Sequence, residues 1–246
     1  MQKLNRMKKI IPNLITLLNV LCGCIATVFA VYSELEIAAI FVFLGIFFDF
    51  FDGLAARLLN VQSELGLQLD SLADMITSGL VPGIVMFQLL KMTTVNGWGE
   101  TLAFDTATLL PFTGFVITMA SAYRLAKFNI DENQTSSFVG LPTPANALLI
   151  LSLPLILLYN SNDFLNEIIL NKWFLIAITL LSAYLLNSSI ALFALKFNKW
   201  SFKGNEQRYL FIILSLVLLL TVKFIAIPVI IVLYILMSLV GSLKSD

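Results

Sequence analysis

Histidine is absent from this sequence of 246 residues, and cysteine occurs only twice. The missing histidine removes the commonest general base and a common zinc ligand, so any catalysis must depend on carboxylates. Cys22 and Cys24 lie in one apolar run, at a spacing that points them to different sides of a helix. They cannot readily bridge each other, so we interpret both as packing residues that say little about the redox compartment.

Charged residues are also scarce, at 12% of the chain, whereas 59% of the residues are hydrophobic and the mean hydropathy is +0.93. Soluble domains carry about a quarter charged residues, so lipid must be a large part of the solvent around this chain. The 15 basic and 15 acidic residues balance, and no basic block with interleaved aromatic residues is present. We therefore expect membrane lipid, and no nucleic acid, among the partners.

Eight apolar stretches approach the ~20 residues that a helix needs to cross the hydrocarbon core. They cover residues 11–32, 37–58, 69–90, 108–130, 145–159, 173–197, 209–222 and 224–243. The first begins too late and is too long for a cleaved signal peptide. A tight turn near Lys223 separates the last two stretches, which can also be read as one long kinked element. The sequence predicts an all-α polytopic membrane protein with about eight transmembrane helices, in a single domain over residues 1–246.

Basic residues predict the orientation of these helices. If the amino terminus is cytoplasmic and the helices alternate, most Lys and Arg residues fall on the cytoplasmic side. These are Lys3, Arg6, Lys8, Lys9, Arg57, Arg124, Lys127, Lys196, Lys199, Lys203, Arg208 and Lys244, against Lys91, Lys172 and Lys223 outside. This bias places both termini in the cytoplasm and supports separate final spans, since merging them would put Lys244 outside. We expect a multi-pass protein of a bacterial cytoplasmic membrane, with its active site on the cytoplasmic side.

Four aspartates interrupt the apolar pattern: Asp49 and Asp52 in the second span, and Asp70 and Asp74 at the start of the third. Each carboxylate would cost roughly 2.5–3.5 kcal/mol at a helix centre. The i, i+3 and i, i+4 spacings put each pair on one helix face, and the short connection makes the two spans antiparallel neighbours. Four carboxylates at close range cannot all stay ionised without cations between them. Oxygen ligands without His or Cys select Mg²⁺, Mn²⁺ or Ca²⁺, and two such ions would neutralise the site.

Small residues share the face that carries these aspartates. Gly53 and Ala56 continue the face of Asp49 and Asp52, and Gly66 lies one turn before Asp70. Small side chains on this face let a bulky headgroup approach the backbone. Arg57, at the membrane edge, can bind a phosphate with its fork of donors. Cations, an arginine and a cleared face together indicate a diphosphate site.

This segment resembles the signature of the CDP-alcohol phosphotransferases, and every fixed position is matched. The matching residues are Asp49, Asp52, Gly53, Ala56, Arg57, Gly66, Asp70 and Asp74. The resemblance extends to residues 12–16, which read Pro-Asn-Leu-Ile-Thr. It implies a six-helix core with two additional C-terminal helices, and usually a homodimer.

The same resemblance implies roles for individual residues. The four aspartates would hold two divalent cations, Mg²⁺ or Mn²⁺, and Asp74 would be the general base. The CDP moiety would be bound by Gly53, Ala56, Arg57 and Gly66, with Asn13 and Thr16 as further candidates. Asn13 and Thr16 can equally be residues that begin the first helix.

Two later segments look like those of the CDP-diacylglycerol–serine phosphatidyltransferases. Residues 124–129 read Arg-Leu-Ala-Lys-Phe-Asn, and residues 138–146 read Phe-Val-Gly-Leu-Pro-Thr-Pro-Ala-Asn. Lys127 departs from the arginine usual there, which keeps the charge but loses bidentate geometry. This resemblance implies transfer of the phosphatidyl group from CDP-diacylglycerol to L-serine. Arg124 and Lys127 would bind the serine carboxylate or a lipid phosphate, or would be positively charged anchors at a helix end.

Other functions explain the aspartates less well. Ion pairing cannot balance them, because the segment supplies one arginine for four carboxylates. A membrane prenyltransferase needs two Asp-rich motifs about half a chain apart, and a cation transporter does not require the glycine and arginine spacings. Within the family, synthesis of phosphatidylglycerophosphate or phosphatidylinositol phosphate is the competing alternative.

Overall fold

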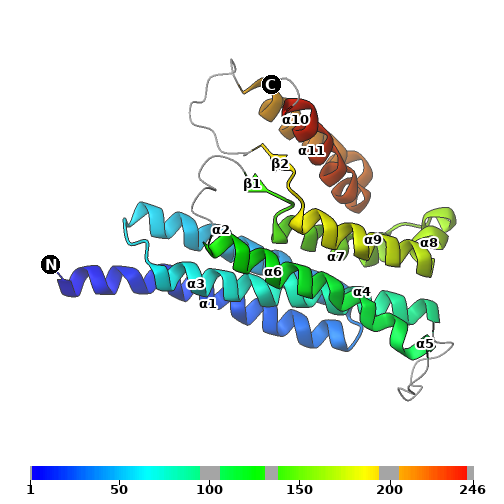
Figure 1. The fold of residues 1–246 in the computed structure, drawn as a ribbon, viewed down its shortest axis with the longest axis horizontal. Helices are drawn as coiled ribbons and strands as arrows, with labels where there is room; N and C mark the ends of the chain where they lie inside the picture. The colour runs from blue at the N-terminus through cyan, green and yellow to red at the C-terminus, as the bar shows by residue number, and fades with distance from the viewer. Residues whose placement is uncertain (1, 95–105, 131–137, 194–204, 243–246) are drawn as a thin grey trace.

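Helices make up almost all of the described chain in a computed structural model, which covers residues 2–94, 106–130, 138–193 and 205–242 (Figure 1). The helices are α1 Gln2–Val31, α2 Leu35–Leu58, α3 Glu64–Asp74, α4 Val81–Thr94, α5 Thr106–Leu109, α6 Val116–Ile130, α7 Thr143–Tyr159, α8 Asp163–Ile169, α9 Lys172–Asn187, α10 Glu206–Val222 and α11 Ala226–Ser242. A π-helical turn, η1 Met75–Leu80, joins α3 to α4, and the 3₁₀ turns η2 Leu110–Phe115 and η3 Lys223–Ile225 precede α6 and α11. The short strands β1 Phe138–Val139 and β2 Ala191–Leu192 pair antiparallel.

The predicted all-α polytopic membrane fold is confirmed. Four helical stretches of the described chain are long and apolar enough to cross a membrane: Ile10–Val31, Leu35–Leu58, Glu64–Thr94 and Glu206–Val240. The pair α8 and α9, bent by 63°, makes a fifth if it is one span, and α7 is a shorter apolar helix. Each of the eight predicted stretches contains helix, whereas the number that cross the membrane stays a prediction.

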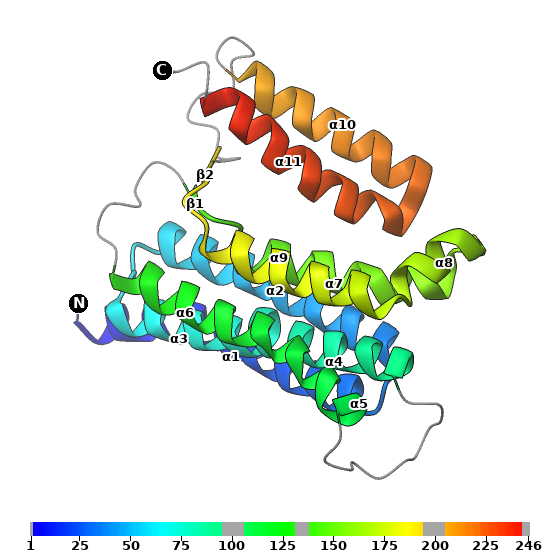
Figure 2. The ribbon, with the colours of Figure 1, turned by 45° about the vertical axis from the view of Figure 1, so that its right-hand side comes forward.

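The last of these stretches is folded back on itself. Lys223 has φ 51° and ψ −122°, outside the helical region, and α10 and α11 lie side by side as a hairpin (Figures 1 and 2). The predicted tight turn near Lys223 is therefore confirmed, and each arm of the hairpin is a helix of 17 residues.

Two predicted boundaries differ from the structure. The stretch 173–197 was expected to be one helix, but α9 ends at Asn187 and residues 188–193 leave it to pair with β1. Gly140 donates its backbone N–H to the carbonyl of Ile190 at 2.9 Å, so the extended chain satisfies its hydrogen bonds with a partner strand. Residues 194–197 lie outside the described part of the chain. At the other end, α1 begins at Gln2, ahead of the apolar stretch.

Small residues allow the two N-terminal helices to approach closely. Ala26 and Ala30 of α1 and Ala38 and Ala39 of α2 are fully buried, as expected where helix packing in lipid depends on close backbone contact. Helix α4 lies among the other helices and is buried along most of its length. Many large apolar side chains of α1, α2, α10 and α11 are exposed instead, on surfaces suited to lipid.

The helix ends agree with the alternation that the basic residues predict. The C-terminal ends of α2 and α6, which carry Arg57 and Lys127, lie toward the N-terminal part of α1 (Figure 1). The C-terminal end of α4 and the start of α9, which carry Lys91 and Lys172, lie at the opposite end. Lys196, Lys199, Lys203 and Lys244 lie outside the described residues, and the cytoplasmic side itself stays a prediction.

The π-helical turn η1 follows Asp74 directly and is held by a buried hydrogen bond. Thr77 Oγ1 donates to Asn19 Oδ1 of α1 at 2.7 Å. A Cβ atom at Gly23 would lie 2.5 Å from Thr77 Oγ1, and one at Gly45 would lie 2.7 Å from Thr77 Cγ2 and 2.8 Å from Asn19 Oδ1. The two glycines therefore form a socket for Thr77, which sets the position of η1 against α1 and α2.

This socket predicts that Gly45→Ala destabilises the protein by about 1–3 kcal/mol, because the added methyl group overpacks a buried contact. The clash must outweigh the roughly 0.5–1 kcal/mol that alanine gains over glycine inside a helix. Unfolding of the detergent-solubilised protein, followed by circular dichroism, measures the change. Gly53→Ala on the same helix is the matched control, because its Cβ would meet nothing nearer than Arg57 Nη1 at 3.7 Å. Equal stability of the two variants would contradict the socket.

Candidate active site

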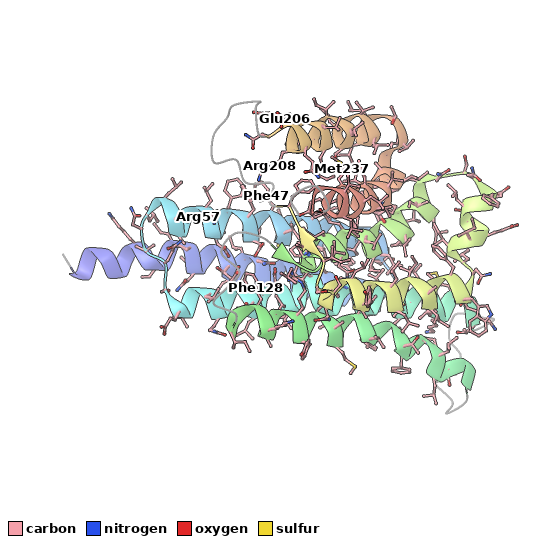
Figure 3. All side chains as sticks on the ribbon, turned by 45° about the horizontal axis from the view of Figure 1, so that its top comes forward. Phe47, Arg57, Phe128, Glu206, Arg208 and Met237 are labelled. Carbon is pink, nitrogen blue, oxygen red and sulfur yellow. The ribbon has the colours of Figure 1, made fainter. Side chains whose placement is uncertain are left out.

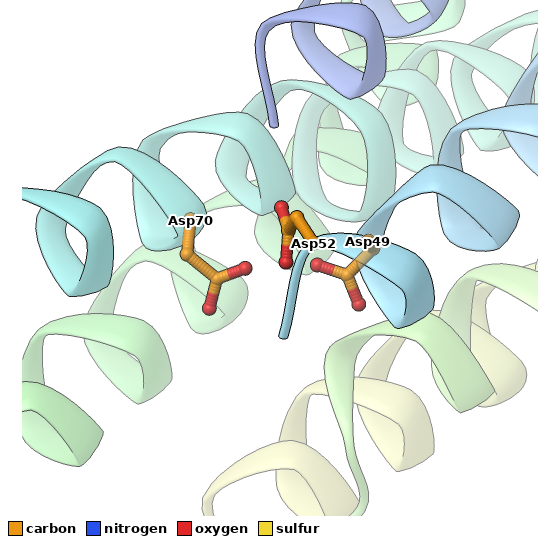
Figure 4. Close-up of side chains that lie close together, drawn as sticks. All are labelled: Asp49, Asp52 and Asp70. Atoms are coloured by element: carbon orange, nitrogen blue, oxygen red, sulfur yellow. The ribbon is translucent and has the colours of Figure 1, made fainter. Parts of the chain in front are cut away.

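Three carboxylates meet where α2 faces α3. Asp49 and Asp52 come from the C-terminal half of α2 and Asp70 from α3, and each offers an oxygen within 4.8 Å of the others (Figure 4). The i, i+3 spacing puts the first two on one face of α2, and the turn between the helices brings Asp70 against them. The predicted convergence of the two aspartate pairs is thus seen for these three residues.

Asp74 belongs to the same face but lies outside this group of three. It ends α3, is 8% exposed, and accepts a hydrogen bond at its Oδ2 atom from Thr143 Oγ1 of α7 at 3.4 Å. Its Oδ1 atom is buried and has no hydrogen-bond partner among the described residues. Asp74 therefore presents one unpartnered oxygen next to the three clustered carboxylates.

The carboxylate group has the properties of a cation site. Asp52 Oδ2, like Asp74 Oδ1, is buried without a donor in the part of the chain that is described. A buried carboxylate oxygen without a donor is costly, and the one nearby arginine of this segment, Arg57, is exposed, so bound cations would stabilise the cluster. Oxygen donors alone fit hard divalent cations such as Mg²⁺ or Mn²⁺. The residues present therefore fit a divalent cation, which Asp49, Asp52 and Asp70 would hold.

A cavity of about 710 Å³ opens beside the carboxylates. Asp49, Asp52 and Asp70 line it together with α1 and the start of α3. All of the residues expected to bind CDP also line it: Asn13, Thr16, Gly53, Ala56, Arg57 and Gly66. The structure thus brings the predicted nucleotide residues and three of the predicted metal ligands to one cavity.

Gly53 and Gly66 serve this cavity in different ways. A Cβ at Gly53 would make only ordinary contacts, so packing does not require glycine there, and its smallness leaves the cavity wall open. Gly66 lies in the first turn of α3, where its N–H donates to the capping Ser63 Oγ at 3.1 Å. The N-terminal turn of α3 lines the cavity, and such a turn favours a bound phosphate. Arg57 projects from the last turn of α2 at the exposed edge (Figure 3).

Asn13 and Thr16 do not begin a helix, so that alternative reading was wrong. Both lie inside α1, which starts at Gln2. Thr16 is 3% exposed and its hydroxyl donates to the Pro12 carbonyl at 3.1 Å, on the side of α1 that faces the cavity. Both line the cavity, and their contact with the nucleotide stays a prediction.

Arg124 and Lys127 line a different and smaller cavity. Phe128, Val139, Leu186, Asn187 and Ser188 complete its wall. Arg124 is only 9% exposed, so it is not a surface anchor, whereas Lys127 is exposed. Arg124 lies close enough to Asp74 for their charges to interact, although Asp74 itself does not line this cavity.

Residues outside the signature hold these parts in place. Asn129 accepts from Ser71 Oγ at 2.9 Å through Oδ1 and donates to Gln68 Oε1 at 3.3 Å through Nδ2. It thereby ties α6 to α3 on both sides of Asp70. Asn129 is the last residue of the segment 124–129, which resembles the serine phosphatidyltransferases, so the sequence could have indicated its importance. The Asn19–Thr77 bond carried none, because its partners are 58 positions apart in the sequence.

Two prolines mark the start of α7. Pro142 immediately precedes α7 and Pro144 lies in its first turn, where the missing N–H has no cost. Gly140 has φ 75°, and a Cβ there would lie 2.6 Å from the Leu186 carbonyl oxygen. This turn and close approach bring Thr143 to Asp74.

Asp70→Asn separates the electrostatic role of the cluster from its packing. Without divalent cations the variant is expected to unfold at the same or a higher temperature than the parent, because one of the mutually repelling charges is gone. Added Mg²⁺ or Mn²⁺ should raise the unfolding temperature of the parent but not of the variant. Ser152→Ala on α7 is a control that leaves the carboxylates intact. Equal stabilisation by the metal in Asp70→Asn and the parent would contradict the metal site.

Comparison with known proteins gives a consistent answer. The family model described as CDP-alcohol phosphatidyltransferase matches residues 9–185. Three relatives are named CDP-diacylglycerol--serine O-phosphatidyltransferase. The Bacillus subtilis protein is 36% identical over 54% of this chain and 69% of its own length. The Helicobacter pylori (strain 26695) protein is 31% identical over 78% of this chain and 75% of its own length. The Mycobacterium leprae protein is 29% identical over 59% of this chain and 46% of its own length.

The matched region includes all four aspartates and the whole lining of the larger cavity, whereas Leu186, Asn187 and Ser188 of the smaller cavity lie just beyond it. It ends at residue 185, so α10 and α11 lie beyond it. From the match and the site geometry together, this chain belongs to the CDP-alcohol phosphatidyltransferase family.

Proposed function

We propose that this protein transfers the phosphatidyl group of CDP-diacylglycerol to the hydroxyl of L-serine, giving phosphatidylserine and CMP. The observation that carries the proposal is the shared cavity, in which three clustered carboxylates and the signature glycines and arginine line one wall. The names of the relatives support serine as the acceptor. The homodimer that the resemblance implies and the cytoplasmic active site that the basic residues predict are part of the same proposal.

The donor lipid would bind from the membrane edge. Its diphosphate would lie against the carboxylate cluster, where divalent cations, when bound, supply the positive charge that polarises the phosphorus. Arg57 and the first turn of α3 would hold phosphate oxygens. The open wall at Gly53 and Ala56 would accept the cytidine, with Asn13 and Thr16 on the opposite helix. The exposed aromatic side chains of α2, including Phe47 and Phe50, would adjoin the acyl chains.

Asp74 would be the general base. It would take the proton from the serine hydroxyl, whose oxygen then forms a bond to the lipid-side phosphorus while the bond from that phosphorus to the CMP oxygen breaks. Thr143 holds Oδ2 of Asp74, and its Oδ1 is the unpartnered oxygen that could accept the proton. Direct displacement of this kind needs no covalent enzyme intermediate.

The test of the proposal is a parallel assay of the purified protein with CDP-diacylglycerol and labelled serine, glycerol 3-phosphate or inositol phosphate. Serine should be consumed fastest, and exhaustive chelation should abolish turnover until Mg²⁺ or Mn²⁺ is restored. Faster use of glycerol 3-phosphate would overturn the serine assignment. Full turnover after chelation would overturn the role of the cations.

Asp74→Asn is expected to lower kcat by a factor on the order of 10²–10⁴, the usual contribution of a positioned base. The amide keeps the shape of the side chain and its contact with Thr143 but cannot accept the proton. Turnover and metal titration should be measured together. Complete recovery of kcat at high metal concentration would mean that Asp74 is a metal ligand only.

A further inference from the structure

The small cavity between α6 and α9 is lined by groups of opposite character. Arg124 and Lys127 contribute positive charge from α6, while Asn187 and Ser188 come from the C-terminal end of α9. Its volume is about 20 Å³, which is room for about one water molecule. The apolar residues Phe128, Val139 and Leu186 complete the lining.

Arg124 presents an unused donor to this region. Its side chain is 9% exposed, and its Nε atom is buried without a hydrogen-bond partner among the residues described. An arginine so placed is costly unless an anion or a water completes its donors. A carboxylate is the planar anion that matches the guanidinium geometry.

Asn187 presents an unused acceptor. Its Nδ2 atom donates to the carbonyl of Ala120 at 3.0 Å and to that of Ala183 at 3.3 Å. These two bonds fix which way the amide faces and tie the end of α9 to α6. Its Oδ1 atom is left buried and has no partner within the described chain. Because Asn187 is the last residue of α9, the partial negative charge of the helix terminus adds to that of the amide oxygen.

We propose that Asn187 Oδ1 binds the ammonium group of the acceptor amino acid while Arg124 binds its carboxylate. This inference rests on the proposed function and adds Asn187 as the residue that distinguishes an amino acid from other alcohols. An amino acid carries the two charges on one carbon, which matches a donor and an acceptor that line one small cavity. A phosphate-bearing alcohol would bring only negative charge to the amide oxygen and the helix terminus.

The position of Arg124 orients such a substrate. Its charge interacts with that of Asp74, so a serine whose carboxylate binds Arg124 would lie near the proposed base. The cavity is too small for the whole molecule, so a lining side chain would have to move for serine to enter, and Lys127 is an exposed one. The structural role of Asn187 is fulfilled by Nδ2 alone, which leaves Oδ1 for the ligand.

The experiment compares three acceptors that differ in one group each. Serine carries both charges, 3-hydroxypropanoate lacks the ammonium, and ethanolamine lacks the carboxylate. In Asn187→Ala, kcat/KM for serine and ethanolamine should fall about 10- to 100-fold, the effect of one hydrogen bond to a charged group, while 3-hydroxypropanoate is unaffected. In Arg124→Ala, kcat/KM should fall for serine and for 3-hydroxypropanoate but not for ethanolamine. KM for CDP-diacylglycerol should stay constant in both variants.

Asn166→Ala is the matched control, because Asn166 of α8 also has a buried Oδ1 without a partner in the described chain but lies outside this cavity. The Asn166→Ala variant should leave kcat/KM for all three acceptors unchanged. If Asn187→Ala does not fold, Asn187→Gln keeps the amide and moves its oxygen by one methylene, and it should still raise KM for serine. Equal losses for serine and 3-hydroxypropanoate in the Asn187 variants would overturn this inference. A parent enzyme that does not use serine would instead overturn the proposed function.

Discussion

The mutual repulsion of carboxylates in an apolar setting is the constraint on which the site depends. Asp49, Asp52 and Asp70 lie within a few ångströms of one another between α2 and α3, and nearby buried oxygens have no donors in the described structure. Helices alone do not hold such an arrangement together, so the surrounding protein must resist its separation. The extensive contact of α1 with α2 and with η1 supplies that resistance through small side chains and through the Thr77–Asn19 bond.

In the proposed reaction, each of the two cavities would serve one substrate. The larger one has carboxylates, glycines and a helix N-terminus, all suited to a diphosphate and its cations. The smaller one has a guanidinium and a helix C-terminus, suited to a molecule that carries both signs of charge. Asp74 belongs to neither lining but interacts with Arg124 beside the second cavity and shares a helix face with Asp70 of the first. A group that must receive a proton between two substrates is expected at such a position.

Local pattern was sufficient to predict the parts whose meaning depends on neighbours in the sequence. The spacing of the aspartates and of Gly53, Arg57 and Gly66 predicted a common face, because helical periodicity relates such residues directly. The predicted end of α9 was wrong because the apolar sequence continues beyond Asn187. The backbone leaves the helix there and pairs with a strand some 50 positions earlier in the chain. Asn19, Thr77 and Asn187 were missed for the same reason: their partners are distant along the chain, and their residue types are unremarkable within an apolar helix.

The π-helical turn after Asp74 lets the aspartates of α3 face a different direction from the one that the helical register of α4 would otherwise impose. A π-turn holds one residue more than an α-turn, and each residue of an α-helix corresponds to about 100° of rotation. The aspartates of α3 and the buried side chains of α4 therefore have different phases on what is otherwise one continuous rod. The half that carries the aspartates can face the cavity while the other half is enclosed by neighbouring helices. Loss of a single residue between positions 75 and 80 would therefore force one of these two surfaces to rotate out of place.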